Sequence, residues 1–349
     1  MLLAFRAVIA GCGRMARGWL DALASPQLAR KVEIVGLVDT ELAAARTLRT
    51  EAGLGNIPAG SDLRAMLLET KPDLLFDIVV PAARRDVAAI GLAYGCHVLS
   101  EKPMATSLDE ARELREVAEA AGRVHAIVQN RRYIAGVRRI RRLIDSGALG
   151  ALTSLHADFF VGAHFGGFRD EMRNVLLLDM AIHTFDAARY MAGRDAIAVY
   201  CQENNPRGSW YAHGAAANAI FDLTDGITFT YRGSWAAEGA NTSWESSWRF
   251  IGTRGTLLWD GADGFDARVV DGGEGFFRPL APIEVPPPAD AAETHGHASV
   301  IAEFVDAIES RRAPETDGSD NIKSLAMVFG AIESARVQKR VDMTVKEPA

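Results

Sequence analysis

The sequence predicts an α/β protein in which a parallel sheet wound with crossover helices is followed by a part rich in antiparallel sheet. Residues 5–123 alternate short apolar runs of strand type with helical patterns. After Gly122 most runs are strand-like, and turns of the Asp-Gly or Gly-rich type separate them. The 349 residues suffice for roughly two domains. We therefore expect one domain at 1–123 and a second at 124–349.

Each element of the first part follows from its local pattern. The strands are expected at Arg6–Ala10, Val32–Val38, Leu74–Val80, His97–Leu99 and Val124–Gln129. Helical patterns near 14–24, 41–52, 62–69, 84–94 and 107–121 lie between them and are long enough for crossovers. Ser107 and Glu110 form a capping box at the start of the last of these helices.

The second part begins with an Arg-rich helix near 135–146, a strand near 152–161 and a helix near 176–192. Strand-like runs continue to residue 284 and include Ile220–Leu223, Ile227–Trp235, Trp248–Ile251 and Thr256–Trp259. The prolines at 286–288 end regular structure, and two helices near 297–310 and 320–338 close the chain.

Composition and charge exclude several classes of protein. A net charge of -7 and a pI of 5.7 oppose nucleic-acid binding. The longest stretches without a charged residue, 87–100 and 208–221, are too short to cross a bilayer, and residues 1–10 lack the features of a secretory signal. Cys12, Cys96 and Cys201 are too far apart for a disulfide framework. We expect a cytoplasmic protein that binds neither nucleic acid nor membrane.

A glycine turn follows the first expected strand. Gly11, Gly13 and Ala16 form the pattern G-x-G-x-x-A, and Arg14 and Met15 open the next helix. The first glycine permits a tight turn, the second lets a pyrophosphate approach the backbone, and the small third residue lets the helix pack on the strand. Free amides at the helix start face the anion. The motif in this position predicts dinucleotide binding.

Asp39 ends the second expected strand, 23 residues beyond Ala16. A dinucleotide-binding fold places a carboxylate there, on the ribose hydroxyls. Its charge would repel a 2′-phosphate, so we expect NAD as the cofactor and regard NADP as less favoured. The alternative is that Asp39 only caps the following helix.

Two groups of residues carry candidate chemistry. Lys102, between Glu101 and Pro103, stands at the carboxyl end of a strand, where the ligand crevice of an open α/β sheet lies. An ordinary surface lysine is the alternative. Asp179 and His183 are one turn apart in a helical pattern, so the carboxylate can hold the imidazole for acid–base chemistry.

The Asp179 and His183 pair also fits other roles. A lone helical His is more often structural, and a metal site would need a third ligand. The candidates for that ligand are His164, Glu171 and His213. No metal motif accompanies them, and we expect no metal. Asp186 is either a second support for His183 or an ordinary helix carboxylate.

Together these motifs resemble the glucose-fructose oxidoreductase / inositol dehydrogenase / rhizopine catabolism (Gfo/Idh/MocA) family over nearly the whole chain. The matching segments, in order and spacing, are Gly11-x-Gly13-x-x-Ala16, Asp39, Glu101-Lys102-Pro103, Asn130-Arg131-Arg132-Tyr133 and Asp179-x-x-x-His183. The segments 95–103 and 146–150 are particularly similar to the family pattern.

The resemblance implies a Rossmann domain, then an α/β domain with a large, mostly antiparallel open sheet. It implies NAD(P)-linked oxidation or reduction of a sugar, polyol or related carbonyl. By position, His183 would take the hydroxyl proton, Lys102 would stabilise charge on that oxygen, and Asp179 would orient the imidazole. The implied cofactor contacts are Gly11, Gly13, Arg14, Met15, Asp39, Pro81, Glu101 and Lys102.

One segment departs from the family pattern. Where the family commonly has Thr-Pro-Asn-x-x-His, this chain has Val-Pro-Ala-Ala-Arg-Arg at 80–85. Arg85 therefore stands in the place of the His, and the Asn that would contact the cofactor is missing. The departure concerns the seating of the nicotinamide ring and leaves the class of protein unchanged.

The substrate candidates are Arg131, Tyr133, His164 and Trp235. The resemblance places Arg131 and Tyr133 against substrate, although Tyr133 suits packing equally well. Trp235 offers an aromatic face for a sugar, a use that competes with packing between subunits. His164 lies in the loop 162–167, which is a flap or a simple connection. Most of the arginines on the helix that follows, Arg138, Arg139, Arg141 and Arg142, are expected on a solvated face or between subunits.

We expect a small sugar-like substrate and a homodimer or homotetramer, since an open sheet needs a partner to cover it. Two other functions fit the same residues. A sensor would bind cofactor or metabolite without turnover, and a glycoside hydrolase or lyase would use NAD only transiently.

Overall fold

The computed structural model describes residues 4–289 and 296–343. Its contacts divide the chain into two compact units. One unit is Met1–Tyr133 with His295–Ile322, and the other is Ile134–Thr294 with Lys323–Ala349.

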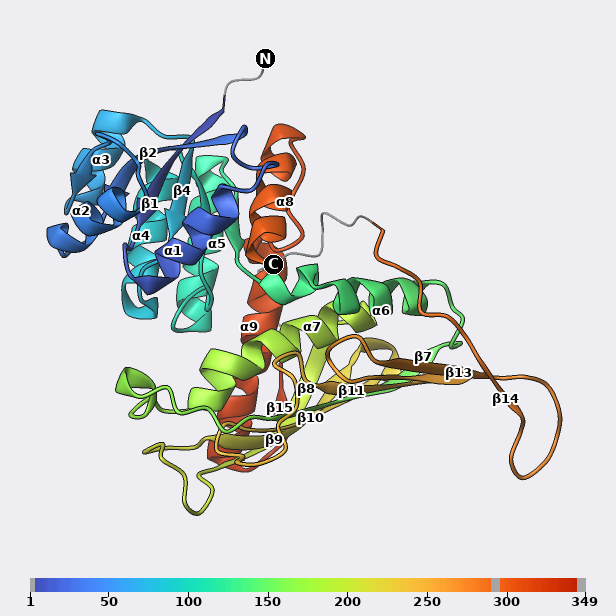
Figure 1. Ribbon diagram of the computed structural model, residues 1–349. Helices are drawn as coiled ribbons and strands as arrows, with labels where there is room; N and C mark the ends of the chain where they lie inside the picture. The colour runs from blue at the N-terminus through green and yellow to red at the C-terminus, as the bar shows by residue number, and fades with distance from the viewer. Residues whose placement is uncertain (1–3, 290–295, 344–349) are drawn as a thin grey trace. The chain divides into compact units, whose positions relative to one another are not determined.

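The first unit holds a six-stranded parallel sheet in the order β3-β2-β1-β4-β5-β6 (Figure 1). Its strands are β1 (Phe5–Ala10), β2 (Val32–Val38), β3 (Ala59–Gly60), β4 (Leu74–Asp77), β5 (His97–Ser100) and β6 (His125–Ile127). Its helices are α1 (Arg14–Leu23), α2 (Leu42–Glu51), α3 (Leu63–Thr70), α4 (Pro81–Ala93), α5 (Leu108–Ala121), the 3-10 turn η1 (Asn130–Tyr133) and α8 (His297–Glu309). The predicted parallel sheet wound with helices is confirmed.

Helices on both faces explain the apolar strands of this sheet. Ile9 in β1 and Phe76 in β4 are fully buried, as parallel strands between helical layers require. Trp19 of α1 packs on Phe76 with ring centroids 5.3 Å apart. Helix α8 adds Val300 and Phe304 to the same core. The unit therefore extends past residue 123, because β6 pairs with β5 and α8 packs on this core.

The second unit is built on a nine-stranded sheet in the order β14-β13-β12-β11-β7-β10-β9-β8-β15 (Figure 1). Its strands are β7 (Leu152–Phe160), β8 (Ala196–Asn204), β9 (Ala216–Leu223), β10 (Thr228–Ser234), β11 (Ser247–Gly252), β12 (Gly255–Trp259), β13 (Phe265–Val270), β14 (Leu280–Pro282) and β15 (Val341–Asp342). Among these described strands only β7 and β10 pair in parallel. The large, mostly antiparallel sheet is confirmed.

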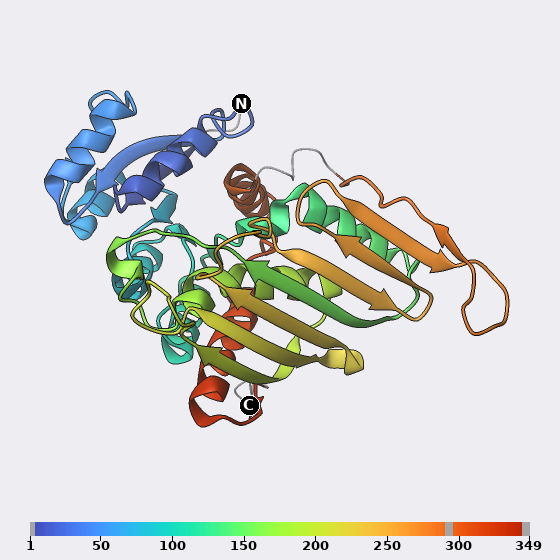
Figure 2. The same cartoon turned by 60° about the horizontal axis from the view of Figure 1, so that its bottom comes forward.

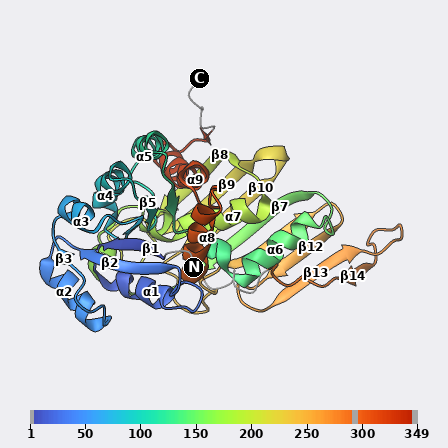
Figure 3. The same ribbon diagram turned by 90° about the horizontal axis from the view of Figure 1, so that it is seen from above.

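Helices cover one face of this sheet and leave the other open (Figures 2 and 3). The covering helices are α6 (Ala135–Asp145), α7 (Ile182–Ala192) and most of α9 (Gly318–Val337). Side chains alternate accordingly: Tyr231 of β10 is fully buried, whereas its neighbours Thr230 and Arg232 reach the open face. The shorter turns are η2 (Gly167–Arg169), the π-helical η3 (Leu176–Ala181) and η4 (Thr224–Gly226).

Two elements differ from their predicted form. The expected helix 176–192 consists of six π-helical residues, Leu176–Ala181, followed by α7. Strand β4 ends at Asp77 and not at Val80, because Pro81 begins α4 and Val80 is the N-cap of that helix. Proline at the first helical position is favoured, since its missing amide has no partner there anyway.

The arginines of α6 bond to backbone within the second unit. Arg139 donates to the carbonyls of Val285 and Pro286 at 2.8 and 3.1 Å, and Arg142 donates to the carbonyl of Pro287 at 3.0 Å. Arg142 is exposed, as on a solvated face, and Arg139 is half-buried, whereas Arg138 is buried and departs from the predicted solvated face. A proline-rich segment cannot enter a strand ladder, so its carbonyls accept bonds from these guanidinium groups.

In the described part of the chain, none of the helices has the length and apolar content needed to cross a membrane. The three cysteines are free and buried. Burial raises the pKa of Cys12 and Cys201 to about 12 and that of Cys96 to about 11.

Candidate active site

The glycine turn between β1 and α1 is closed on one side and open on the other. Gly11 has a φ of +94°, and a Cβ at this position would lie 2.7 Å from the backbone of Ile78. A Cβ on Gly13 would meet no atom within 4 Å. The turn therefore needs glycine at 11 and leaves room beside 13.

Helix α1 starts at the open side of this turn. Its N-cap is Gly13, no side chain caps its first amides, and no acidic residue lies in its first turn. Uncapped amides at a helix N-terminus attract an anion such as a pyrophosphate. A hollow of about 330 Å³ adjoins the turn and is lined by Cys12, Gly13, Arg14, Arg17, Ala44, Thr47, Leu48 and Glu51. These features fit a dinucleotide whose phosphates lie on the amides of Gly13, Arg14 and Met15.

Asp39 bonds to both the glycine turn and the start of α2. Its Oδ2 accepts from the amide of Cys12 at 2.7 Å, and its Oδ1 accepts from the amide of Glu41 at 2.9 Å. Glu41 is the N-cap of α2. A carboxylate has roughly four acceptor sites, so these two bonds leave capacity for ribose hydroxyls. No side chain caps α2 itself, so the bond to Glu41 holds the chain just before the helix and is compatible with cofactor binding at Asp39.

Glu101 is buried at the end of β5, and its carboxylate is bonded within the first unit. The Trp19 indole donates to its Oε1 at 2.8 Å, and His297 Nε2 lies 3.1 Å from the same oxygen. Burial alone would raise the pKa of Glu101, but the bonds to His297 and Trp19 outweigh burial and lower this pKa. The ionised carboxylate anchors the turn that carries Lys102.

Lys102 follows β5 at the carboxyl edge of the sheet, the edge at which Gly11 follows β1. Only β4 lies between those two strands, and Pro81 starts α4 just beyond it. Lys102 is half-buried, and its peptide bond to Pro103 is cis. Lys102, Gly11 and Pro81 thus share the edge at which open α/β sheets bind ligands.

In the second unit, Asp179 lies in the π-helical segment and His183 lies in the first turn of α7. Arg169 donates from Nε to Asp179 Oδ2 at 2.6 Å. His183 is half-buried. The π turn replaces the uniform α-helix from which a common face was predicted, so the pairing of Asp179 with His183 stays a prediction.

Aromatic side chains surround Arg169. Its guanidinium lies 5.1 Å from the ring centroid of Phe165 and 4.8 Å from that of Phe168. Phe165 in turn lies 5.2 Å from Trp235. Trp235 is buried, and its Nε1 has no hydrogen-bond partner among the described residues. A buried indole N–H of this kind is a donor that a ligand or a water can use.

The loop that carries His164 is held by contacts of its own. His164 Nε2 lies 2.6 Å from Glu238 Oε1, and its ring stacks on Trp210 at 3.7 Å. The Trp210 indole donates to the carbonyl of Ala163. His164 itself is exposed, so its proposed contact with substrate remains a prediction.

Tyr133 is fully buried in η1, and its hydroxyl donates to Glu303 at 3.3 Å. Arg132 is also buried and donates to Asp320 at 2.5 Å. Arg131 is half-buried. The burial and bonding of Tyr133 favour the packing alternative for this residue, whereas Arg131 stays a substrate candidate.

Asp186 is bonded inside the second unit. It accepts from the Ser324 hydroxyl at 2.6 Å and lies 4.0 Å from Arg189. These partners favour an ordinary structural carboxylate. Within residues 4–289 and 296–343, no group of three or more His, Cys, Asp or Glu side chains is arranged to hold a metal.

Arg169 and His297 take part in these networks although the sequence prediction does not include them. Arg169 bonds to a carboxylate ten residues later, across the turn from a Gly-rich loop into the π-helical segment. His297 bonds to Glu101, which is 196 residues away in the chain. Neither partner leaves a signal in the local sequence: Arg169 lies seven residues before Leu176, where the helical segment starts, and His297 is distant from Glu101 in the chain.

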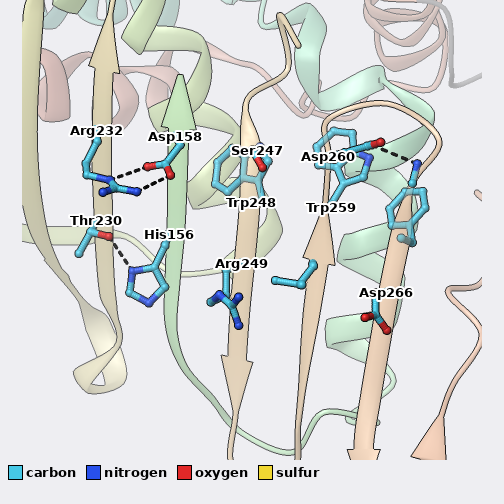
Figure 4. Close-up of a pocket in the computed structure, with 13 residues that line it drawn as sticks. His156, Asp158, Thr230, Arg232, Ser247, Trp248, Arg249, Trp259, Asp260 and Asp266 are labelled. Atoms are coloured by element: carbon cyan, nitrogen blue, oxygen red, sulfur yellow. Dashed lines mark hydrogen bonds and ion pairs between the residues drawn. The ribbon is translucent and has the colours of Figure 1, made fainter. Parts of the chain in front are cut away.

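A second hollow, of about 800 Å³, lies on the open face of the nine-stranded sheet (Figure 4). Polar side chains of neighbouring strands meet there: Arg232 pairs with Asp158 at 2.5 Å, and His156 bonds to Thr230 at 2.6 Å. Such cross-strand pairs suit a face in contact with water. The residues lining it include none of the predicted site residues.

Comparisons with known proteins agree with this architecture. Residues 5–129 match the family described as "Oxidoreductase family, NAD-binding Rossmann fold", and residues 137–258 match "GFO/IDH/MocA C-terminal domain".

Two curated proteins and one solved structure are among the similar proteins. The chain is 30% identical over 171 residues to D-glucoside 3-dehydrogenase of Escherichia coli, covering 48% of each chain. It is 25% identical over 332 residues to 1,5-anhydro-D-fructose reductase of Ensifer adhaerens, covering 93% of this chain and 94% of that one. The structure is an oxidoreductase from Agrobacterium radiobacter in complex with NAD+, L-tartaric acid and magnesium, with a TM-score of 0.84 at 20% identity and coverage of 97% and 98%.

Proposed function

Because this chain belongs to the Gfo/Idh/MocA family of oxidoreductases with an NAD-binding Rossmann fold, we propose that it oxidises or reduces a sugar, polyol or related compound. The reacting group is a secondary alcohol or its carbonyl, and the hydride goes to or comes from the nicotinamide ring of NAD. The two curated relatives named above act on a glucoside and on an anhydro sugar, which supports this substrate class.

The observation that carries the proposal is the shared edge of the first sheet. The uncapped N-terminus of α1, the carboxylate of Asp39 and the turn at Lys102 all follow strands at this edge. Asp39 would accept the ribose hydroxyls, and the amides at Gly13 would hold the phosphates. Lys102 would then donate a hydrogen bond to the oxygen of the reacting carbon and stabilise its negative charge.

His183 is the proposed general base for alcohol oxidation and the general acid for carbonyl reduction. An imidazole suits both directions because its ordinary pKa lies near neutral pH. Asp179 would orient that imidazole, and the bond from Arg169 supports this role by fixing the carboxylate. Arg131, His164 and Trp235 are the proposed substrate contacts. The strongest feature among them is the indole N–H of Trp235, which has no hydrogen-bond partner in the part of the chain that the structure describes.

The test is NADH formation by the purified protein with NAD and a panel of inositols, aldoses, anhydro sugars and amino sugars, with and without a chelator. Lys102→Ala and His183→Ala should each lower kcat by about 10²-fold or more, as loss of a proton-transfer group does. Their affinity for NAD should stay near that of the wild type. Lys339→Ala, which removes an exposed lysine, is the matched control.

Two results would contradict the proposal. Unchanged turnover in both variants would reject Lys102 and His183 as the catalytic pair. Product formation without net NADH would identify a hydrolase or lyase with transient redox chemistry.

We also propose that the chain forms a homodimer or homotetramer and is located in the cytoplasm. Tyr200 and Ile220 are exposed on the open sheet face, and Phe276 and Phe277 are almost fully exposed between β13 and β14. Apolar side chains gathered on a surface commonly mark an interface. A monomer mass by light scattering would contradict the oligomer, and recovery in a membrane or secreted fraction would contradict the location.

A further inference from the structure

Arg84 and Arg85 are neighbours in the first turns of α4, and the structure gives them opposite environments. Arg85 is exposed and bonds to Glu113 and Asp86 at the surface. Arg84 is only 1% exposed. The basic residue that enters the interior of the first unit is therefore Arg84, and not the arginine that replaces the family's usual His.

The guanidinium of Arg84 joins the ends of two adjacent strands. Its Nη2 donates to the carbonyl of Val79 at 2.5 Å, just beyond β4. Its Nη1 donates to the carbonyl of Pro103 at 2.8 Å, in the turn that follows β5. The planar guanidinium presents several donors in a fixed geometry, so one side chain can hold both carbonyls in place.

Asp77 supplies the charge that this buried cation requires. Its side chain is fully buried, and its Oδ2 lies 3.5 Å from Arg84 Nε. Asp77 Oδ1 also accepts from the amide of Val79. Apolar residues could fill such a space without the cost of removing two charges from water, so a buried pair is weak support for stability. The distinctive effect of this pair is to fix backbone geometry.

The turn that follows β5 is thus held in place on both sides of Lys102. Glu101, the residue before it, is bonded to Trp19 and His297. Pro103, the residue after it, is bonded to Arg84. The backbone at Lys102 therefore lies between two anchored neighbours.

We propose that Arg84 is a positioning residue for the reaction, because it holds the carbonyl of Pro103 and thereby sets where the Lys102 side chain starts. The proposal rests on the catalytic role proposed above for Lys102. Catalytic groups must be held close to their working geometry, and a shift of about 1 Å can lower turnover by about 10²-fold.

The experiment compares Arg84→Met and Arg84→Lys with Arg112→Gln, which changes a surface arginine of α5 paired with Asp109, in the full-length protein. Lysine keeps the charge next to Asp77 but lacks the fork that reaches two carbonyls, and it decides the outcome if the Met variant does not fold. The protein has only six lysines, so labelling their Cε with 13C gives a simple NMR spectrum. The signal of Lys102 is identified by its loss in Lys102→Arg.

We expect the Lys102 signal to shift in the Arg84 variants while the other five stay in place. With a substrate found in the panel, kcat should fall by about 10- to 100-fold, the loss expected for a displaced catalytic group. The Kd for NAD should stay near the wild-type value. Arg112→Gln should change neither the signal nor kcat.

A folded Arg84 variant with wild-type kcat would overturn the proposal, and so would a fall in kcat without a shift of the Lys102 signal. Failure of the underlying function has a different signature. If Lys102→Ala keeps the wild-type kcat, the catalytic role of Lys102 is rejected. In that case the reaction does not depend on the position of Lys102 that Arg84 sets.

Discussion

Arg169 Nε donates to Asp179 Oδ2 at 2.6 Å, and this bond ties a Gly-rich loop to the helical segment that carries the proposed acid–base pair. The same guanidinium lies over Phe165 and Phe168. The guanidinium of Arg169 thus interacts with a carboxylate and with two aromatic faces, all of which guanidinium groups favour. The orientation of Asp179 therefore depends on a residue outside every recognised motif.

Replacing Arg169 should impair catalysis more than folding. In Arg169→Gln the Asp179 carboxylate loses its charged donor at Oδ2 and is held less firmly, so kcat should fall by about tenfold. Arg173→Gln, an exposed arginine of the same loop, is the control and should leave kcat unchanged. Steady-state kinetics with both variants tests this, and equal kcat values in the two would show that Arg169 only fastens the loop.

Asp39→Ala should weaken the binding of NAD and reduce the preference for NAD over NADP. The carboxylate both accepts ribose hydroxyls and repels a 2′-phosphate, and both effects disappear together. Asp62→Ala is the matched control, because Asp62 caps α3 through the amide of Ala65 and has no part in the glycine turn. Calorimetric titration of both nucleotides gives the ratio of their affinities. A ratio that is unchanged in Asp39→Ala would leave the bonds to the amides of Cys12 and Glu41 as the sole role of Asp39.

Tyr133→Phe should destabilise the folded protein without changing the KM for substrate. The change removes the bond from the buried hydroxyl to Glu303 and should cost about 1 kcal/mol of unfolding free energy. KM should stay the same, because the burial of Tyr133 favours packing over contact with substrate. Urea unfolding and steady-state kinetics give the two values. A raised KM together with a wild-type free energy of unfolding would show that Tyr133 contacts substrate after all.

The buried imidazole of His125 should make stability depend on pH. Burial, with a smaller effect from Arg84, lowers the pKa of His125 from 6.5 to about 4. The unfolded chain binds this proton near pH 6.5 and the folded chain only near pH 4. The neutral imidazole of His125 therefore contributes fully to the free energy of unfolding above pH 6.5. This contribution, about 3 kcal/mol in all, is lost as the pH falls toward 4.

The substitution His125→Gln removes this titration while keeping a polar group next to Ser100, whose hydroxyl lies 3.0 Å from the imidazole. Unfolding free energies at pH 7 and pH 5 should differ less in His125→Gln than in the wild type. An equal difference in the two proteins would assign the pH dependence to other groups.

Local sequence predicts the first unit well because its elements carry their own signals. The run Phe5–Ala10, the glycine turn and the apolar face of α1 are each recognisable without tertiary contacts. The π turn at Leu176–Ala181 has no such signal: its Leu-Leu-Leu-Asp-Met-Ala sequence suits an ordinary α-helix. Strand β14 ends in Pro282, which only an edge strand tolerates, and its edge position is set by the rest of the sheet.

Some features of the candidate site are likewise predicted by local sequence, whereas others depend on contacts between distant segments. The positions of Asp39 just after β2 and of Lys102 just after β5 follow from motifs and spacing. The burial of Arg84 could also have been predicted, since Ala88 and Gly91 follow it at helical spacing on the buried face of α4. The partners of Glu101 could not, because His297 comes from a helix late in the chain.

The three buried thiols make the opening of each unit measurable on its own. An alkylating reagent reacts with an exposed thiolate, and the raised pKa values keep these cysteines protonated and inert while the fold is closed. Cys12 and Cys96 belong to the first unit and Cys201 to the second. The order in which a trace of reagent labels these sites would therefore report which unit unfolds first, and a dinucleotide that slows labelling of Cys12 and Cys96 alone would reveal which unit it stabilises.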